Sequence, residues 1–206
     1  MPPTGAIQII YNNSVGGPKN NTVSISPSTN ALDFGFDGAN CLRQLWTGSD
    51  ANARRVQRGI GEVYRTGRLH RKPVIVVHGR SDTLIPTNFS SRHYVLRNAQ
   101  VEGHHSRLRY VEVTNAQHFD SFLPFAGYDT RFIPLHLYFV RAMDAMWAHL
   151  KTGAALPPSQ VVRTTPRGGV PGAAPALAAA NVPAIATSPA PADLISVDGN
   201  TLRVPE

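Results

Sequence analysis

An aspartate and a histidine each follow a stretch with the composition of a buried strand. Asp82 stands in the turn "GRSDTLIP", four residues after "VIVVH", and His118 stands in "TNAQHFD", five residues after "RYVEV". A carboxylate that accepts from one ring nitrogen of a histidine fixes the tautomer and stabilises the imidazolium, which leaves the other nitrogen free to act as general base and then general acid. We therefore hypothesise that Asp82 and His118 form an acid–base pair.

The elements around these residues predict how the pair is brought together. Residues 73–78 and 107–113 are rich in β-branched residues and are predicted strands, and the segment 90–103 between them is a predicted helix that ends at Gly103. A helix between two parallel strands gives a right-handed connection. The carboxyl ends of both strands then meet at the sheet edge where α/β proteins bind ligands, so both side chains are expected there.

The remaining pattern predicts an incomplete sheet. The order of elements indicates an α/β domain whose parallel sheet has about three core strands and flanking helices, fewer strands than a complete doubly wound domain needs. We also expect Trp147 to lie in the core and Cys41 to be a buried thiol. The other predicted segments are a strand at 6–11, irregular structure over 12–41, a helix over 51–66 with Asp50 as its N-cap, and a helix from Pro134 to about Lys151.

The composition changes after Gly153, so the sequence predicts an α/β part over 1–153, which carries Asp82 and His118, and a tail over 154–206. Residues 171–192 contain ten Ala and five Pro, a composition that does not form a regular helix or a core of its own. An extended, partly ordered path is expected there. The final stretch "LISVDGNTLRV" has two strand-like pieces about an Asp-Gly turn, which predicts a small hairpin.

The net charge of +7 raises the question of an acidic partner. Seven of the 20 Lys and Arg residues lie between positions 54 and 72, largely on the predicted helix 51–66. No aromatic side chains alternate with them as in a single-strand binder, so a solvated helix face is favoured over a nucleic-acid patch. No apolar run approaches the roughly 20 residues of a membrane-spanning helix. Nucleic acid and membrane are therefore not expected partners, and a single cysteine excludes a cysteine metal cage.

A serine nucleophile would complete the chemistry, but no G-x-S-x-G motif occurs. "NNSVG" places Ser14 directly after the predicted strand 6–11, where a nucleophile would stand. The segment then runs into Gly17-Pro18 and a polar loop rather than into the helix whose N-terminus helps to form an oxyanion site. Ser14 is therefore a weak candidate, with a structural turn as the alternative. Taken singly, Asp82 and His118 also have plainer interpretations, as a turn former and a loop histidine.

Two groups of motifs resemble known proteins. "VIVVHGRSDTLIP" and "VTNAQHFDSF" resemble the acid and histidine segments of the α/β-hydrolase superfamily. The wider sequence, from "IQIIYNNSVGGPKNNTVSISPSTNALDFGFDGANCLRQLWTG" to "LPPSQVVRTTPRGG", resembles the C-terminal part of the D-(-)-3-hydroxybutyrate oligomer hydrolase family. The resemblance covers essentially the whole chain, including its irregular segments.

This resemblance implies a serine esterase that hydrolyses short 3-hydroxybutyrate esters to monomers, without metal or organic cofactor. It implies that Asp82 is the triad acid and His118 the base, and that the nucleophile belongs to a missing N-terminal portion, so this chain alone is expected to be inactive. It further implies a secreted or periplasmic location, with a cytoplasmic one as the alternative. Two rivals stay open: a self-sufficient small hydrolase that uses Ser14, and a non-catalytic binding or structural module.

Overall fold

The computed structural model describes residues 26, 28–30 and 34–206, and the chain divides into two compact units, Met1–Tyr64 and Arg65–Glu206. The described part of the first unit contains helices α1 (Phe34–Thr47) and α2 (Ala51–Glu62). Asp50 caps α2 as predicted, because its carboxylate accepts from the N–H groups of Asn52 and Ala53 at 2.8 and 3.0 Å. The predicted strand 6–11 lies outside the described residues.

Three sequence predictions for the first unit are wrong. Residues from Phe34 to Cys41, predicted as irregular, belong to α1, and the predicted helix 51–66 ends at Glu62. Cys41 is exposed rather than buried. The prediction was based on the apolar neighbours Leu42 and Leu45, but Leu42 is 69% exposed and Leu45 is only partly buried.

The second unit is built on a three-stranded parallel sheet of order β1-β2-β3. The strands are β1 (Val74–Gly79), β2 (Leu108–Val113) and β3 (Gln160–Val162), and helix α3 (Ser91–Glu102) connects the first two. The predicted strands at 73–78 and 107–113 and the helix between them are thus confirmed, including the stop at Gly103. β3 was not predicted: it comes from the 154–206 segment and pairs with β2, so part of the predicted tail belongs to the sheet.

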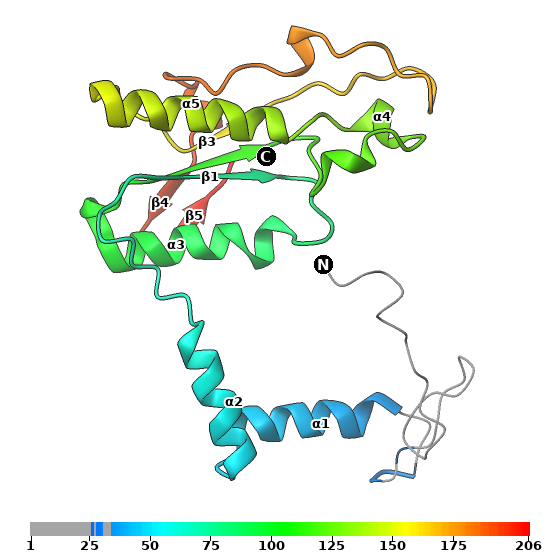
Figure 1. Ribbon diagram of the computed structural model, residues 1–206, viewed down its shortest axis with the longest axis vertical. Helices are drawn as coiled ribbons and strands as arrows, with labels where there is room; N and C mark the ends of the chain where they lie inside the picture. The colour runs from blue at the N-terminus through cyan, green and yellow to red at the C-terminus, as the bar shows by residue number, and fades with distance from the viewer. Residues whose placement is uncertain (1–25, 27, 31–33) are drawn as a thin grey trace. The chain divides into compact units, whose positions relative to one another are not determined.

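Helices cover both faces of this sheet. Helix α5 (His136–Thr152) packs on one face, and α3 with the terminal hairpin packs on the other (Figure 1). Successive side chains of β2 point to opposite faces of the sheet, so β2 contributes to a hydrophobic core on each face. Val111 and Val113 pack with Tyr138 of α5, whereas Leu108 and Tyr110 pack with Val95 of α3.

Helix α5 buries one side only, and the prediction that Trp147 is a core residue is wrong. Tyr138 and Ala142, one turn apart, are the buried residues of α5, while Trp147 is 64% exposed. Trp147 is nine residues beyond Tyr138, and at about 100° per residue it lies on the opposite side of the helix. The ammonium of Lys151 lies 4.7 Å from the centre of its ring, so the indole contacts a solvated cation instead of the sheet.

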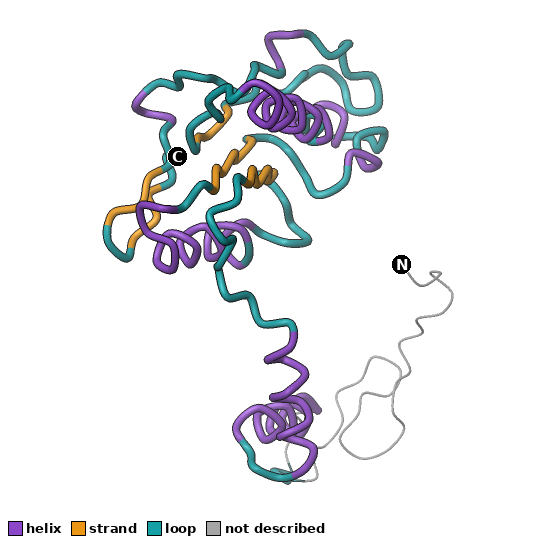
Figure 2. The backbone as a smooth tube through the Cα atoms, turned by 60° about the vertical axis from the view of Figure 1, so that its left-hand side comes forward, coloured by secondary structure: helices purple, strands orange, loops and turns teal. Residues whose placement is uncertain are grey.

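Beyond α5 the chain follows a largely extended path along the second unit (Figure 2). Gln160 of β3 fixes this path, since its side-chain amide donates to the carbonyl of Ala186 and accepts from the same residue's N–H. Strands β4 (Ser196–Asp198) and β5 (Thr201–Arg203) then pair antiparallel about Gly199. The short helical turns of the described residues are η2 (Thr87–Phe89), η3 (Gly103–His105), η4 (Asp120–Phe122), α4 (Tyr128–Arg131), η5 (Ala179–Asn181) and η6 (Pro191–Asp193).

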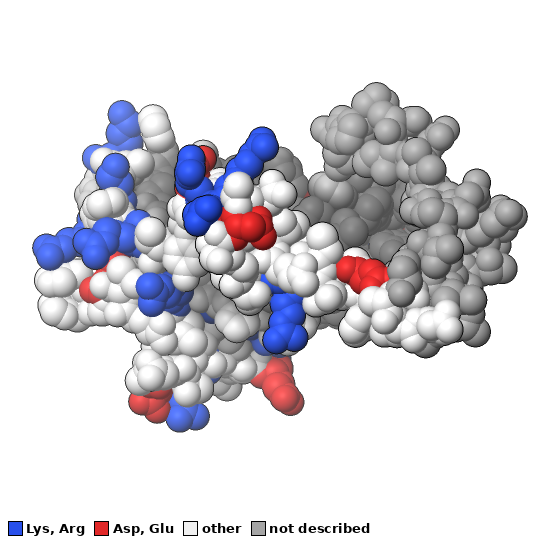
Figure 3. Space-filling view, turned by 90° about the horizontal axis from the view of Figure 1, so that it is seen from below, with Lys and Arg blue, Asp and Glu red and all other residues white. Residues whose placement is uncertain are grey.

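The basic residues are largely solvated. Arg54, Arg55 and Arg58 of α2 are exposed. On the face shown in Figure 3, basic side chains stand as separate groups among neutral ones, with acidic side chains next to some of them. Among the described helices, none is both long and apolar enough to span a membrane.

Candidate active site

The carboxyl ends of β1 and β2 are held together by backbone contacts. After β1 ends, the N–H of Arg80 donates to the carbonyl of Val113 at 2.7 Å, and the N–H of Ser81 donates to the carbonyl of Ala116 at 3.0 Å. Gly79 makes this approach sterically allowed, because a Cβ at that position would lie 2.4 Å from the carbonyl oxygen of Ala116. The loop after β1 and the loop after β2 therefore lie side by side.

This approach places Asp82 against His118, as the sequence predicted. Oδ2 of Asp82 lies 2.8 Å from Nδ1 of His118, and Asp82 is only 5% exposed. Oδ1 of the same carboxylate accepts from the N–H groups of Leu84 and Ile85 at 2.9 and 2.8 Å. The two loops thus bring the proposed acid and base within hydrogen-bond distance, while their roles in catalysis stay a prediction.

The surroundings of Asp82 keep it ionised. Burial opposes the charge and raises the pKa of Asp82, but hydrogen bonds from Ile85 N–H, from the His118 ring and from Leu84 N–H outweigh it. The net result is a pKa below the usual value of the carboxyl group. Because an ionised carboxylate only accepts hydrogen bonds, Nδ1 of His118 carries the proton and Nε2 is unprotonated in the neutral ring.

Nε2 of His118 is available for chemistry. The His118 side chain is 25% exposed, and no described residue forms a hydrogen bond to Nε2. Phe119 packs edge-on against the imidazole, with ring centroids 4.2 Å apart. Asp82 therefore orients the imidazole of His118 through Nδ1, and Phe119 packs against the ring. Nε2 stays accessible to a hydroxyl that approaches the sheet edge.

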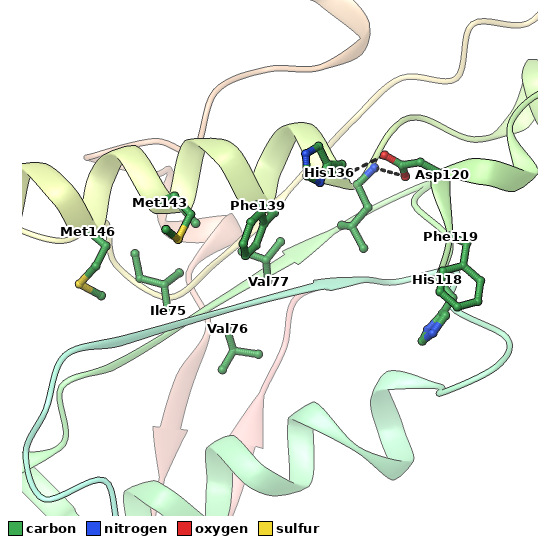
Figure 4. Close-up of a pocket in the computed structure, with 12 residues that line it drawn as sticks. Ile75, Val76, Val77, His118, Phe119, Asp120, His136, Phe139, Met143 and Met146 are labelled. Carbon is green, nitrogen blue, oxygen red and sulfur yellow. Dashed lines mark hydrogen bonds between the residues drawn. The ribbon is translucent and has the colours of Figure 1, made fainter. Parts of the chain in front are cut away.

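A groove of about 700 Å³ begins at His118 and runs between β1 and α5 (Figure 4). Its walls are largely apolar: Ile75 and Val77 come from β1, and Phe139, Met143 and Met146 come from α5. At its polar end, the carboxylate of Asp120 accepts from the backbone N–H groups of Leu135 and His136 at 2.7 and 2.9 Å, which stabilises the start of α5.

Sequence reasoning missed two residues of the site. His78 in β1 contacts the same Asp82 oxygen as His118, with Nε2 at 3.2 Å from Oδ2. Glu112 in β2 is completely buried, and it accepts hydrogen bonds from Arg80 and from Arg92. The sequence did contain a signal for these two residues: His78 and Glu112 are polar residues within the predicted strands "VIVVHG" and "LRYVEV". Burial raises the pKa of Glu112, but the hydrogen bonds from Arg92 and Arg80 outweigh this effect, and the net pKa of Glu112 is below its normal value.

The weak nucleophile candidate, Ser14, lies outside the described residues.

The fold and site define an α/β protein whose parallel sheet carries an oriented carboxylate–histidine pair at its carboxyl edge. Comparison with known sequences specifies the family. The model of the family described as 3HB-oligomer hydrolase (3HBOH) matches residues 1–206, and the chain belongs to this family.

Named relatives agree with this assignment. The chain is 56% identical over 209 residues to a D-(-)-3-hydroxybutyrate oligomer hydrolase of Azoarcus sp. (strain BH72), and the match covers 100% of this chain and 30% of the relative. It is 51% identical over 209 residues to the hydrolase of the same description from Cupriavidus necator, covering 100% of the chain and 29% of the relative. This chain thus spans less than a third of the length of these relatives. No solved structure matches it.

Proposed function

We propose that this chain is the C-terminal part of a serine esterase that hydrolyses D-3-hydroxybutyrate oligomers to monomers, with Asp82 as the acid and His118 as the base of the triad. The observation that carries the proposal is the 2.8 Å contact between Asp82 Oδ2 and His118 Nδ1 in a member of the 3HB-oligomer hydrolase family. On this proposal, the nucleophilic serine and the oxyanion donors belong to the rest of the enzyme, since the chain spans only 30% of the Azoarcus relative.

The geometry supports a standard acyl-transfer sequence. Nε2 of His118 takes the proton of the serine hydroxyl as the serine oxygen attacks the ester carbonyl, and Asp82 stabilises the imidazolium that forms. The imidazolium then donates this proton to the departing alkoxide, which leaves as an alcohol. Water attacks the acyl-enzyme in the second half, with His118 again as the base, and the second product is a carboxylic acid. Each proton taken by His118 is returned, so the ring ends in its starting state.

The edge of the sheet next to the site is suited to bind the rest of the enzyme. Within the described residues, β1 pairs with β2 alone, and all its residues except Gly79 are only partly buried. Beside it, Phe139 and Met143 of the groove are 52% and 55% exposed. An unpaired edge and an exposed apolar surface favour association. We propose that the missing portion adds a strand along β1 and covers this groove, which would bring its serine towards His118.

Reconstitution from two polypeptides tests the proposal. The part of the Azoarcus relative that this chain does not span is produced separately and mixed with the chain, and release of 3-hydroxybutyrate from its dimer is measured. We expect no turnover by either part alone and turnover by the mixture. His118→Ala in the chain should abolish it, because no base remains.

The same assay distinguishes the rivals. Turnover by the chain alone that is lost in Ser14→Ala would show a self-sufficient hydrolase and contradict the proposal. A serine-directed phosphonate gives an independent readout, since labelling at Ser14 requires an activated hydroxyl. A mixture in which both parts are folded and associated, yet without turnover, would instead favour a binding module.

A further inference from the structure

The carboxylate of Asp82 is shared between two histidines. Its Oδ2 atom lies 2.8 Å from Nδ1 of His118 and 3.2 Å from Nε2 of His78. Nε2 of His78 also lies 3.0 Å from the carbonyl oxygen of Ile85. Both partners of this nitrogen are acceptors, so Nε2 of His78 must carry a hydrogen. Together with the N–H groups of Leu84 and Ile85, Asp82 receives four donors, which fills the acceptor capacity of a carboxylate.

The other nitrogen of His78 starts a chain of polar contacts through the α3 side of the sheet. Nδ1 lies 2.6 Å from Oγ of Ser91, this Oγ lies 2.8 Å from the hydroxyl of Tyr110, and that hydroxyl lies 2.8 Å from Oε2 of Glu112. Ser91, Tyr110 and Glu112 are all buried. Water therefore has little access to repair a contact that lacks a proton, and each contact has to be satisfied within the chain.

This chain of contacts holds the imidazole of His78 from its Nδ1 side. Its far end is Glu112, which accepts from the hydroxyl of Tyr110 and from Arg92 and Arg80. The orientation of the His78 ring therefore depends on buried groups of β2 and α3.

We propose that His78 is a positioning residue for the Asp82–His118 pair: its Nε2–H donates to Asp82, and the Ser91–Tyr110–Glu112 chain holds its ring on the other side. The proposal rests on the proposed function for its catalytic meaning, but the tautomer of each histidine can be measured without turnover. Its physical effect is to keep the Asp82 carboxylate from rotating. The oxygen that His118 uses thus stays in place when the serine is absent.

Nitrogen-15 NMR of the histidine-labelled chain at about pH 7.5 reports which ring nitrogen of each histidine carries a hydrogen. We expect a hydrogen on Nε2 of His78 and on Nδ1 of His118. Tyr110→Phe interrupts the chain that holds the His78 ring, and the Nε2–H signal of His78 should weaken. Tyr138→Phe is the matched control: it removes a buried hydroxyl that donates to Pro183, on the other face of the sheet, and should leave His78 unchanged. A His78 without a hydrogen on Nε2 in the unmodified chain would overturn the proposal.

The positioning role has a separate readout at His118. His78→Gln retains an N–H donor for Asp82, whereas His78→Leu removes it. We expect His118 to keep a single Nδ1–H tautomer in the Gln variant and to gain the Nε2–H tautomer in the Leu variant. A His118 that keeps one tautomer in the Leu variant would show that His78 does not position the pair. Should Tyr110→Phe not fold, Ser91→Ala interrupts the same chain and should weaken the same Nε2–H signal of His78.

Discussion

Gly79 and Ala116 are in backbone contact at the point where the two site loops meet: a Cβ on Gly79 would lie 2.4 Å from the Ala116 carbonyl oxygen. We therefore expect Gly79→Ala to destabilise the chain by about 1–3 kcal/mol, the usual cost of overpacking. The two loops should separate, and Asp82 and His118 with them. Chemical denaturation measures the first effect, and loss of the Nδ1–H signal of His118 measures the second.

The same substitution at Gly59 provides a control of opposite sign. Gly59 lies inside α2, and a Cβ there would meet nothing within 4 Å. Gly59→Ala should therefore stabilise α2, by about 0.5–1 kcal/mol, because alanine loses less backbone entropy in a helix. If the two variants had equal stability, steric contact at Gly79 would not be the reason for the glycine.

The buried Glu112 makes stability depend on pH in a defined direction. Its pKa is lowered from 4.5 in the folded chain, so its ionised form stabilises the fold above about pH 4.5. This stabilisation is lost as the pH falls through the folded pKa. Asp82, with a pKa lowered from 3.8, adds to the loss at still lower pH. Thermal unfolding of the unmodified chain between pH 7 and 3 should show this decline.

Glu112→Gln should reduce that dependence. At pH 7 we expect it to destabilise the chain by about 3–5 kcal/mol, because Arg80 and Arg92 lose the charge that neutralises them. At pH 3 the difference from the unmodified chain should narrow. Asp144→Asn on the exposed side of α5 is the control and should change the unfolding free energy by less than about 0.5 kcal/mol. A difference for Glu112→Gln that is constant with pH would contradict the argument.

Asp82→Asn tests the tautomer argument in the reconstituted enzyme. An asparagine retains the size of the side chain but can present an N–H to His118, which favours the wrong tautomer. We expect kcat to fall by about 10⁴-fold with little change in KM, since the lost interaction develops in the transition state. Steady-state kinetics on the hydroxybutyrate dimer measures both constants. A rise in KM at unchanged kcat would instead assign Asp82 to substrate binding.

The groove beside β1 is expected to be required for association rather than for folding. Phe139→Asp places a charge among Ile75, Val77 and Met143, where the missing portion is proposed to bind. Because Phe139 is half exposed, the isolated chain should unfold at nearly the same denaturant concentration, while turnover of the mixture should fall at least about tenfold. Trp147→Asp is the matched control on the same helix, outside the groove, and should leave turnover unchanged. Equal losses in both variants would contradict a specific docking surface.

Local sequence patterns were sufficient for most of what positions the pair. β-branched residues indicated β1 and β2, and the intervening segment has the length and stop signal of α3. Because a helical connection favours parallel strands with their carboxyl ends at the same edge, Asp82 and His118 could be assigned to one sheet edge from the sequence alone. The errors at Trp147 and Cys41 have one origin: an apolar neighbourhood in sequence does not tell which side of a helix finds a partner.

The sequence by itself determined that an acid and a histidine follow neighbouring parallel strands, because strand, helix and turn preferences are local. Only the tertiary structure decided that Asp82 also accepts a hydrogen bond from His78 and that β3, from the predicted tail, joins the sheet. It also decided that Glu112 is the last member of the buried series of hydrogen bonds through Ser91 and Tyr110. These depend on register: β1 and β2 pair with Val77 opposite Val111, which sets His78 beside Glu112 and across from Ser91. Such contacts join residues that no local pattern relates, since packing in three dimensions selects them.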